Sequence, residues 1–323
     1  MLNNNTLDND YNIIRYLGRG GFSKIFLITN RNDNNNQYVA RIRITNKHTE
    51  DIARNEKFNY EHELQMAKIA SGLNNPNIIH LVGHGSGTLV EEGRVYNNIN
   101  YMILEYCSRG NLFDYIKKGR FIEKHAKIIF KKILLGVQAL HGAGYCHRNL
   151  KPGVILLDNN FNPKISNFLL TTQFLKNNQI IMLKDYAGAL LYMSPQILEY
   201  ETFESYNGEK ADIFGLGVIL FYLVTGKYGF KRKAKKDDPY YKHIILENIN
   251  EYWASLPVEI TNIDYSDEFK DLYIKMICYN ENNRPSIPQI LNHHWFDEIS
   301  NLDSEQLNEL ELDVRNDFLS RLN

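Results

Sequence analysis

A change of hydrophobic period divides this chain into two regions and limits the folds that it can adopt. Between Tyr11 and Ile44, short runs rich in β-branched and aromatic residues alternate with glycine or Asn-Asp punctuation, which is typical of a β-meander. From Asn111 onward, apolar residues recur mostly at helical spacing. Strands followed by helices, rather than alternating with them, indicate an α+β fold. We therefore expect a small β-rich lobe followed by a larger, mainly helical lobe.

The same periodicities predict individual elements. The expected strands are Tyr11–Leu17, Lys24–Ile28, Tyr38–Ile42 and Asn97–Tyr106. The expected helices are Asn55–Ala70, Ile122–His141, Lys210–Thr225, Asp267–Cys278 and Ile287–Leu291. Two polar clusters, Asn30 to Gln37 and Val90 to Asn100, are interpreted as connections between strands.

Composition excludes several classes of partner. A length of 323 residues with 43% hydrophobic content is ample for a buried core. The formal net charge is −1, so nothing favours nucleic acid or a membrane as partner. The basic run at 231–236 is followed directly by Asp237 and Asp238, and we interpret it as a solvated loop. The longest apolar stretch, Ile213 to Val224, is shorter than the about 20 residues that span a bilayer.

Cysteine usage and the N-terminus indicate the compartment. The three cysteines, Cys107, Cys146 and Cys278, are widely spaced and form no metal-binding pair, which favours a reducing, intracellular setting. The N-terminus is polar and rich in asparagine, without the apolar core of a secretory signal. We therefore expect a soluble, cytoplasmic protein.

A series of short motifs runs along the chain in a fixed order. The motifs are Leu17–Ile25, Val39–Arg41, Glu105–Cys107, His147–Asp158, Asn167–Leu169, Gly188–Leu190, Ser194–Gln196, Asn207–Phe214 and Asn283–Ser286. In this order and spacing they resemble the eukaryotic protein kinase domain, from about Tyr11 to Phe296. The strongest local similarity is to the calcium/calmodulin-dependent kinase group.

The resemblance implies a bilobal protein kinase fold of the α+β class, with a single helix, αC, in the small lobe. It divides the chain into a polar N-terminal extension (1–10), a small lobe (11–104), a hinge (105–111), a large lobe (112–297) and an acidic amphipathic helix (298–323).

The residues that would perform the chemistry of the family are replaced. Asn149 stands where the family has a carboxylate base, and Val154 stands where it has a carboxamide ligand for Mg²⁺. Asn167 replaces the metal-binding aspartate, and Leu169 replaces the glycine that follows it. An amide is a very poor base near pH 7, and an isopropyl group cannot bind Mg²⁺. No metal site is therefore expected.

The small-lobe part of the site also departs from the family. Arg41 replaces the lysine that contacts phosphates, and its guanidinium does not reproduce a compact ammonium. Its expected partner is Glu63 on αC, with Glu61 as the alternative. The resemblance assigns a vestigial nucleotide site to Gly18, Gly20, Gly21, Ile25, Val39, Arg41, Leu104, Glu105, Cys107 and Leu156.

The residues that the family uses for architecture are retained. The resemblance implies that His147 stacks on Phe168 and that Asp212 holds the backbone at His147 and Arg148; Lys151 is kept as well. Arg284 is expected to anchor the large lobe, although Gln196 in place of a glutamate leaves it a neutral hydrogen bond.

We therefore interpret the chain as a pseudokinase, a catalytically inactive scaffold or allosteric regulator that binds a protein partner, for example an active kinase. The alternative is an atypical, weakly active ATP-dependent serine/threonine kinase. No cofactor is expected, and binding of ATP without metal is the less favoured reading.

Apolar residues on the predicted C-terminal helix leave two interpretations open. The helix either packs on the large lobe or contacts a partner. Between Gln173 and Met193 the segment holds tyrosines but neither serine nor threonine, so activation by phosphothreonine there is not expected.

Overall fold

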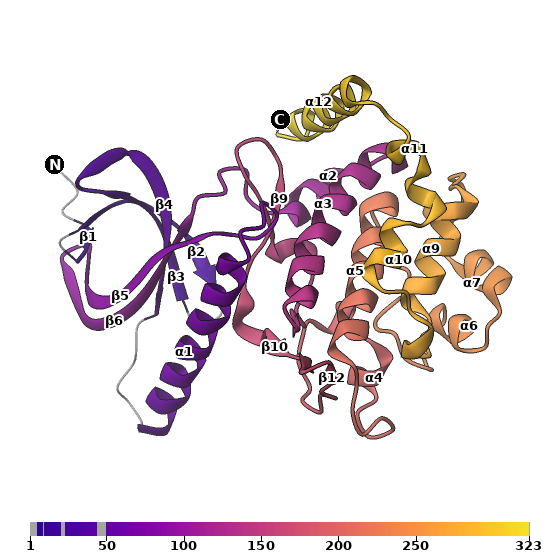
Figure 1. Cartoon of the computed structure of the whole chain (residues 1–323), viewed down its shortest axis with the longest axis horizontal. Coiled ribbons are helices and arrows are strands. Elements are labelled where there is room, and N and C mark those ends of the chain that lie inside the picture. Colours follow the sequence, from indigo (N-terminus) through magenta and orange to yellow (C-terminus); the bar gives the residue numbers. More distant parts are fainter. Residues whose placement is uncertain (1–4, 9, 21–22, 44–49, 323) are drawn as a thin grey trace. The chain divides into compact units, whose positions relative to one another are not determined.

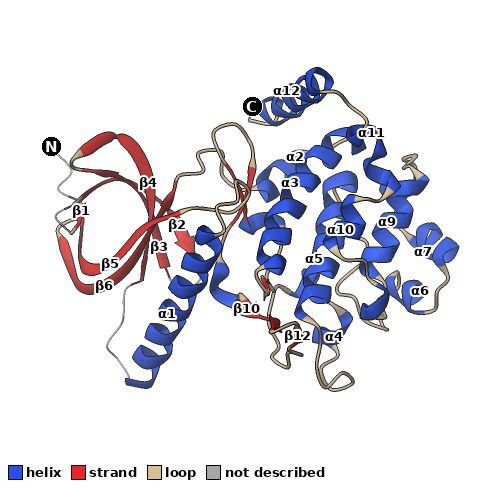
Figure 2. Cartoon of the chain, in the orientation of Figure 1, coloured by secondary structure: helices blue, strands red, loops and turns tan. Residues whose placement is uncertain are grey.

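The computed structural model describes residues 5–8, 10–20, 23–43 and 50–322, and only the backbone at residues 20, 34, 35 and 50–59. The chain divides into two compact units, residues 1–108 and residues 109–323, called here the N-terminal unit and the C-terminal unit. Strands dominate the first unit and helices the second (Figure 2). This confirms the predicted α+β class. The division lies inside the segment 105–111 that the sequence analysis assigned to a hinge.

Six antiparallel strands of the N-terminal unit form a closed barrel in the order β1-β2-β3-β4-β6-β5 (Figure 1). The strands are β1 Thr6–Leu7, β2 Tyr11–Gly20, β3 Ser23–Asn30, β4 Asp33–Arg43, β5 Leu81–Glu91 and β6 Arg94–Glu105. Apolar side chains from all six strands fill the barrel, among them Leu7, Phe26, Ile28, Ile42, Leu89 and Ile103. Because β1 pairs with both β2 and β5, the barrel closes and the described strands form a sheet without an edge strand.

The closing strand β1 corrects the assignment of residues 1–10 to a polar extension. Thr6 pairs with Asn12 of β2 and with Val90 of β5, and Leu7 is fully buried. Asp8 extends the connection, because its carboxylate accepts hydrogen bonds from the Thr88 amide (2.7 Å) and the Tyr101 hydroxyl (2.7 Å). The burial of Leu7 and the pairing of β1 with a strand on each side therefore make this segment part of the barrel, although the residues around Leu7 are polar.

The two polar clusters predicted as connections are mostly strand. Residues 33–37 belong to β4, and residues 94–100 belong to β6, while β5 was missed altogether. The backbone ladder of a barrel continues through polar residues when alternate side chains point to solvent. The prediction assigned these strand ends to loops because their composition is polar.

One long helix, α1 (Glu50–Gly72), accompanies the barrel. It begins five residues before the predicted start at Asn55. Met66, Ala67 and Ala70 are buried, and the Tyr60 hydroxyl donates a hydrogen bond to the Tyr101 carbonyl of β6 at 2.8 Å. These contacts fix the helix to the sheet.

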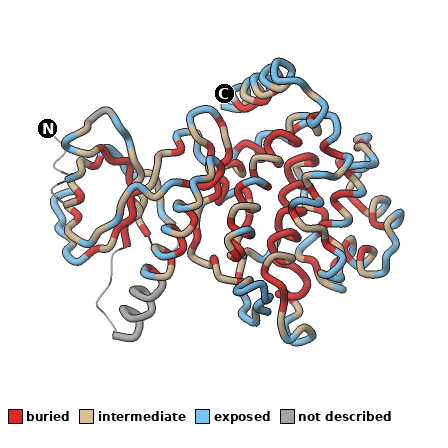
Figure 3. The backbone as a smooth tube through the Cα atoms, in the orientation of Figure 1, coloured by how far each residue is buried: buried red, intermediate tan, exposed pale blue. Residues whose placement is uncertain are grey.

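The C-terminal unit is built around α5 (Gly208–Thr225), which is buried along nearly its whole length (Figure 3). Gly217 allows α9 to approach α5 closely, because a Cβ there would lie 2.8 Å from the Ile277 side chain. The other helices are α2 Leu112–Lys118, α3 Glu123–Gly142, α4 Pro195–Leu198, α6 Tyr241–Ile245, α7 Ile249–Ser255, α8 Val258–Thr261, α9 Asp267–Ile277, α10 Ile287–Leu291, α11 Asp297–Ser300 and α12 Ser304–Ser320. The helices predicted in this unit agree with α3, α5, α9 and α10 within two residues.

Short elements connect these helices and carry the motifs. The short strands are β7 Tyr145–Cys146, β8 Ile155–Leu157, β9 Pro163–Ile165, β10 Thr172–Gln173, β11 Leu175–Lys176 and β12 Gln179–Ile180, and the 3-10 turns include η1 Pro152–Val154, η2 Phe168–Leu170 and η3 Leu190–Tyr192. No helix in the part of the chain that the structure describes combines the length and the apolar character needed to cross a bilayer.

The last helix, α12, packs on the C-terminal unit with its buried face, Leu310, Val314 and Phe318. Its N-terminus is closed by a capping box between Asp303 and Gln306, so the helix itself is shorter than the predicted range 298–323. Its packing supports the first of the two interpretations left open by the sequence.

Candidate functional site

In the N-terminal unit, Arg41 on β4 forms an ion pair with Glu63 on α1. The second oxygen of the same carboxylate faces the Arg43 guanidinium at 3.2 Å, and Glu63 is only 1% exposed. Arg41 also donates from Nε to the Ser23 hydroxyl at 3.4 Å. The structure thus decides between the two predicted partners, since Glu61 is exposed on the same helix. The positive charge of Arg41 is therefore compensated by Glu63 within the N-terminal unit.

The glycine-rich motif Leu17–Ile25 covers the end of β2 and the start of β3. Gly18 lies opposite Ile25 in the sheet with φ +153°, and Gly20 ends β2. The predicted Gly21 lies outside the described residues. Lys24 does not replace the missing lysine, because its ammonium pairs with Glu91 on β5 and lies over the Tyr96 ring.

The other nucleotide-site positions of this unit lie on neighbouring strands. Val39 pairs with Leu104 across β4 and β6. The Glu105 carboxylate accepts a hydrogen bond from the His80 amide at 2.7 Å, and Cys107 is buried. The carboxylate of Glu105 therefore serves the backbone of its own unit.

In the C-terminal unit, Asp212 holds the loop that follows β7. Its two oxygens accept hydrogen bonds from the backbone amides of His147 and Arg148, both at 2.7 Å, and from the His141 imidazole at 2.9 Å. Arg148 has φ +61°, a conformation that costs about 1–3 kcal/mol in a non-glycine residue. Asp212, which is 2% exposed, thus stabilises a strained loop. This is the contact expected from the sequence.

The Arg148 guanidinium is a hub for the segment after η2. It donates to the Leu170 carbonyl at 2.7 Å and to the Tyr206 hydroxyl at 3.2 Å, and it forms an ion pair with Asp185. Hydrogen bonds to its neighbours outweigh burial and raise the pKa of Arg148. The segment after η2 is therefore held to Arg148 by the carboxylate of Asp185.

His147 is fully buried and lies against Phe168 with ring centroids 5.8 Å apart. One ring nitrogen is 3.0 Å from the Ser166 carbonyl. Burial lowers the pKa of His147, although Asp212 acts in the opposite direction. The ring is thus a neutral structural group.

At the positions of the base and of the metal ligands the structure offers little chemistry. Asn149 is half-buried, and Lys151 precedes η1 without a cap from its side chain. Val154 is 4% exposed and packs in the core, while its carbonyl accepts two hydrogen bonds from Ser166. The valine has therefore become part of the hydrophobic packing.

Asn167 and Leu169 alter the next motif. Asn167 has left-handed backbone angles (φ +68°), and its amide oxygen is buried without a hydrogen-bond partner among the described residues. Leu169 lies within the 3-10 turn η2. Leu156, a predicted nucleotide-site residue, lies in β8 and forms a β-bridge with Asn111. A 3-10 turn does not require glycine, so leucine fits at 169.

Arg284, at 1% exposure, ties several elements together at the base of this unit. It donates to the Gln196 side chain at 2.7 Å and to the carbonyls of Cys278 (3.0 Å) and Lys210 (3.1 Å). Its guanidinium also lies over Phe214 at 5.0 Å. The neutral hydrogen bond to Gln196 that the sequence predicted is present.

These residues do not fit a magnesium–nucleotide site. Mg²⁺ is held in such sites by one or two carboxylates together with phosphate oxygens. Asn149, Val154 and Asn167 provide no carboxylate but two amide oxygens, of which that of Asn167 is buried without a hydrogen-bond partner among the described residues. Within the described residues no group of three or more His, Cys, Asp or Glu side chains could hold a metal ion.

The comparison with known families decides the membership of the chain. Residues 11–296 match the model described as the protein kinase domain. The chain belongs to the protein kinase domain family. The predicted kinase fold is thereby confirmed.

Curated members of this family are similar over most of this kinase domain. It is 29% identical to CBL-interacting serine/threonine-protein kinase 18 of Arabidopsis thaliana, over 91% of this chain and 50% of that protein. It is 30% identical to CBL-interacting protein kinase 26 of Oryza sativa subsp. japonica, over 91% of this chain and 53% of that protein. For 3-phosphoinositide-dependent protein kinase B of Dictyostelium discoideum the identity is 30%, over 91% of this chain and 29% of that protein. The chain thus spans about half the length of these relatives, or less.

Two contacts of this kinase domain were missed by the sequence analysis. Arg43 is two residues from Arg41 on one strand, so both side chains point to the same face, and this spacing could have revealed the second cation at Glu63. The pairing of Arg148 with Asp185 has no comparable signal, because 37 residues separate the partners.

Proposed function

We propose that this kinase domain is a pseudokinase that acts as a protein-binding scaffold or allosteric regulator. One observation carries the proposal: the base position and both metal-ligand positions, Asn149, Val154 and Asn167, hold no carboxylate. A positioned general base contributes about 10²- to 10⁴-fold to a rate, and metal ions add several kcal/mol of charge stabilisation. These contributions act on the same step, so their combined loss leaves little turnover.

The contacts of the N-terminal unit support an allosteric role. Glu63 is held by two guanidinium groups, Arg41 and Arg43, so α1 is fixed to the sheet without phosphates. A helix held in this way presents a constant surface to a protein partner, for example an active kinase. The three cysteines, Cys107, Cys146 and Cys278, are widely spaced along the chain, which supports the proposed cytoplasmic location.

The second candidate is an atypical, weakly active serine/threonine kinase. It is favoured by the names of the relatives given above, which are kinases, among them one named as a serine/threonine kinase. Binding of ATP without metal is compatible with this second candidate and also with a chain that transfers no phosphate.

Purified full chain mixed with ATP, with and without Mg²⁺, separates the two candidates. The proposal predicts no metal-dependent thermal shift and no phosphoryl transfer to a generic basic protein. A variant with Asn149→Asp, Val154→Asn and Asn167→Asp is expected to gain a Mg²⁺-dependent thermal shift, because it restores oxygen ligands.

Metal-dependent turnover of the natural chain would defeat the pseudokinase proposal if it disappears in Arg41→Ala while that variant remains folded. The Lys236→Ala variant, which removes an exposed charge elsewhere, serves as the matched control.

A further inference from the structure

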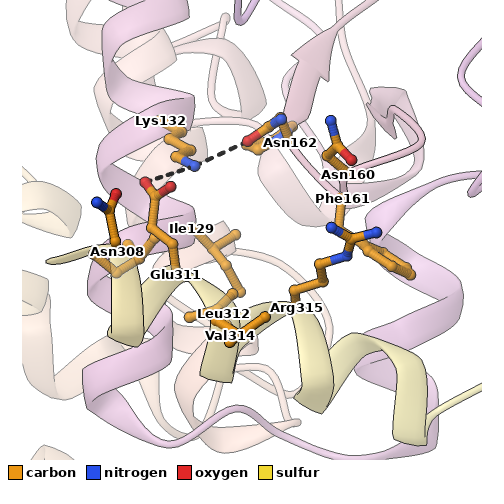
Figure 4. A pocket seen from close by; sticks show the side chains of 12 residues that line it. Ile129, Lys132, Asn160, Phe161, Asn162, Asn308, Glu311, Leu312, Val314 and Arg315 are labelled. Atoms are coloured by element: carbon orange, nitrogen blue, oxygen red, sulfur yellow. Dashed lines mark hydrogen bonds and ion pairs between the residues drawn. The ribbon is translucent and has the colours of Figure 1, made fainter. Parts of the chain in front are cut away.

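A groove of about 380 Å³ lies between α3, the turn before β9 and α12 of the C-terminal unit (Figure 4). This volume is within the range of about 300–1,000 Å³ that binding pockets occupy. All of its lining residues belong to this one unit. None of them is among the nucleotide-site or catalytic-loop positions described above.

The groove carries an uncompensated positive charge. Lys132 is satisfied, because its ammonium is 2.9 Å from both the Asn162 amide oxygen and the Glu311 carboxylate. Arg315, by contrast, is half-buried and has no ion pair or hydrogen bond within the described part of the chain. Figure 4 shows its side chain reaching from α12 toward Asn160 and Phe161. A carboxylate would complete this guanidinium through two parallel hydrogen bonds.

Apolar groups lie beside that charge. Ile129 of α3 forms part of the floor at 2% exposure, and Leu312 of α12 is 56% exposed at the rim. The amides of Asn160 and Asn308 also line the groove. The lining therefore suits an apolar side chain next to an acidic one, with amides available to a peptide backbone.

The walls of the groove are fixed before any ligand arrives. Phe161 has φ +63°, an uncommon backbone for a bulky residue, and it is held by stacking on Phe318 of α12 at 5.1 Å and by the Arg109 guanidinium at 4.9 Å. Asp317 of α12 is 2.8 Å from His125 of α3. A preformed groove saves ordering cost on binding.

We infer that this groove binds an extended segment of a protein partner, in which an Asp or Glu lies next to an apolar residue. The carboxylate pairs with Arg315, and the apolar side chain packs against Leu312 and Ile129. The inference rests on the proposed function, since it names the kind of segment through which a protein-binding scaffold would engage its partner.

The test uses a display library of random nine-residue peptides selected on the full chain. We expect the recovered peptides to contain Asp or Glu beside an apolar residue. A labelled peptide from this set should bind Arg315→Glu at least about 10- to 100-fold more weakly, as lost charge-assisted hydrogen bonds imply. Leu312→Ala should weaken it by a smaller factor, and Lys236→Ala should bind as the natural chain does.

Several outcomes would overturn the inference. These are a library that yields no binders, peptides without acidic enrichment, and peptides that bind Arg315→Glu as tightly as the natural chain. Displacement of the peptide by free glutarate at equal concentration would also do so, because it would assign the groove to small carboxylates. Phosphoryl transfer by the natural chain would defeat the proposed function instead, and it is measured separately on the same preparations.

Discussion

Glu63 is a carboxylate buried between two arginines, and its removal should be costly. In Glu63→Ala the Arg41 guanidinium remains in place, at 14% side-chain exposure, without the carboxylate that forms its ion pair. Breaking a buried pair in this way costs about 3–5 kcal/mol. We expect a loss of this size in the stability of the N-terminal unit.

Hydrogen exchange of the α1 amides in the full chain measures this loss. Tryptophan fluorescence would not report it, because Trp253 and Trp295 both lie in the C-terminal unit. Glu61→Ala, on the same helix but exposed, is the matched control and should change exchange little. Equal protection of α1 in both variants would contradict the role given to Glu63.

At the scale of single residues, much of the chemistry could be predicted from sequence. The replacements at Asn149, Val154 and Asn167 follow from residue identity alone, since no fold gives a valine side chain an oxygen. The strained backbone of Arg148 and the orphaned oxygen of Asn167 could not be predicted, because both depend on neighbours distant in the chain.

Among the elements, α12 is attached by an aromatic cluster and an arginine. The Phe318 ring contacts Phe161, Tyr115 and Phe121 with centroids 5.0–5.1 Å apart. The Arg321 guanidinium lies 3.7 Å from the Phe121 ring centroid and donates to the Arg120 carbonyl at 2.8 Å. The end of the helix is therefore fixed by aromatic and cationic contacts, in addition to the buried side chains Leu310 and Val314.

Phe318→Ala should release this helix. Truncation of a fully buried phenylalanine costs about 3–5 kcal/mol of stability. We expect the remaining contacts of α12 to be too weak to offset this loss. We expect faster proteolysis and hydrogen exchange within Ser304–Ser320. Leu319→Ala, at a neighbouring position that is 37% exposed, should leave both unchanged; similar release by both variants would show that docking does not depend on Phe318.

Elements with a clear period were predictable, whereas elements defined by pairing were not. α3 and α5 were found because their apolar spacing is helical over many residues. β1 has two residues and becomes a strand only through partners on both sides. β5 alternates without strong apolar contrast, so its identity depends on the ladder with β6.

At the scale of the whole molecule, the stability of the C-terminal unit, which contains His147, should fall in mild acid. Burial lowers the pKa of His147 in the folded state, whereas its pKa in the unfolded chain is about 6.5. Below about pH 6.5 the unfolded chain therefore binds a proton at this imidazole more readily than the folded state does. The free energy of unfolding should decrease as the pH falls from 7.5 to 5, by at most about 1.4 kcal/mol per pH unit from this group.

Denaturant unfolding followed by tryptophan fluorescence at several pH values tests this. His147→Gln should flatten the pH dependence, whatever its effect on stability at pH 7.5. His294→Gln, where the side chain is 84% exposed, should retain the slope of the natural chain. An unchanged slope in His147→Gln would remove His147 as the cause.

The sequence by itself determined the α+β class, the kinase motifs and the residue types at positions 149, 154 and 167, because period and residue identity are local properties. Only the tertiary structure decided that Glu63 meets two arginines, that β1 closes the barrel and that Phe318 of α12 is buried. It also decided that Arg315 has no counter-charge among the residues that the structure describes. The physical reason is that each of these depends on groups brought together from distant parts of the chain, where packing and electrostatic pairing decide the outcome and local spacing carries no record of it.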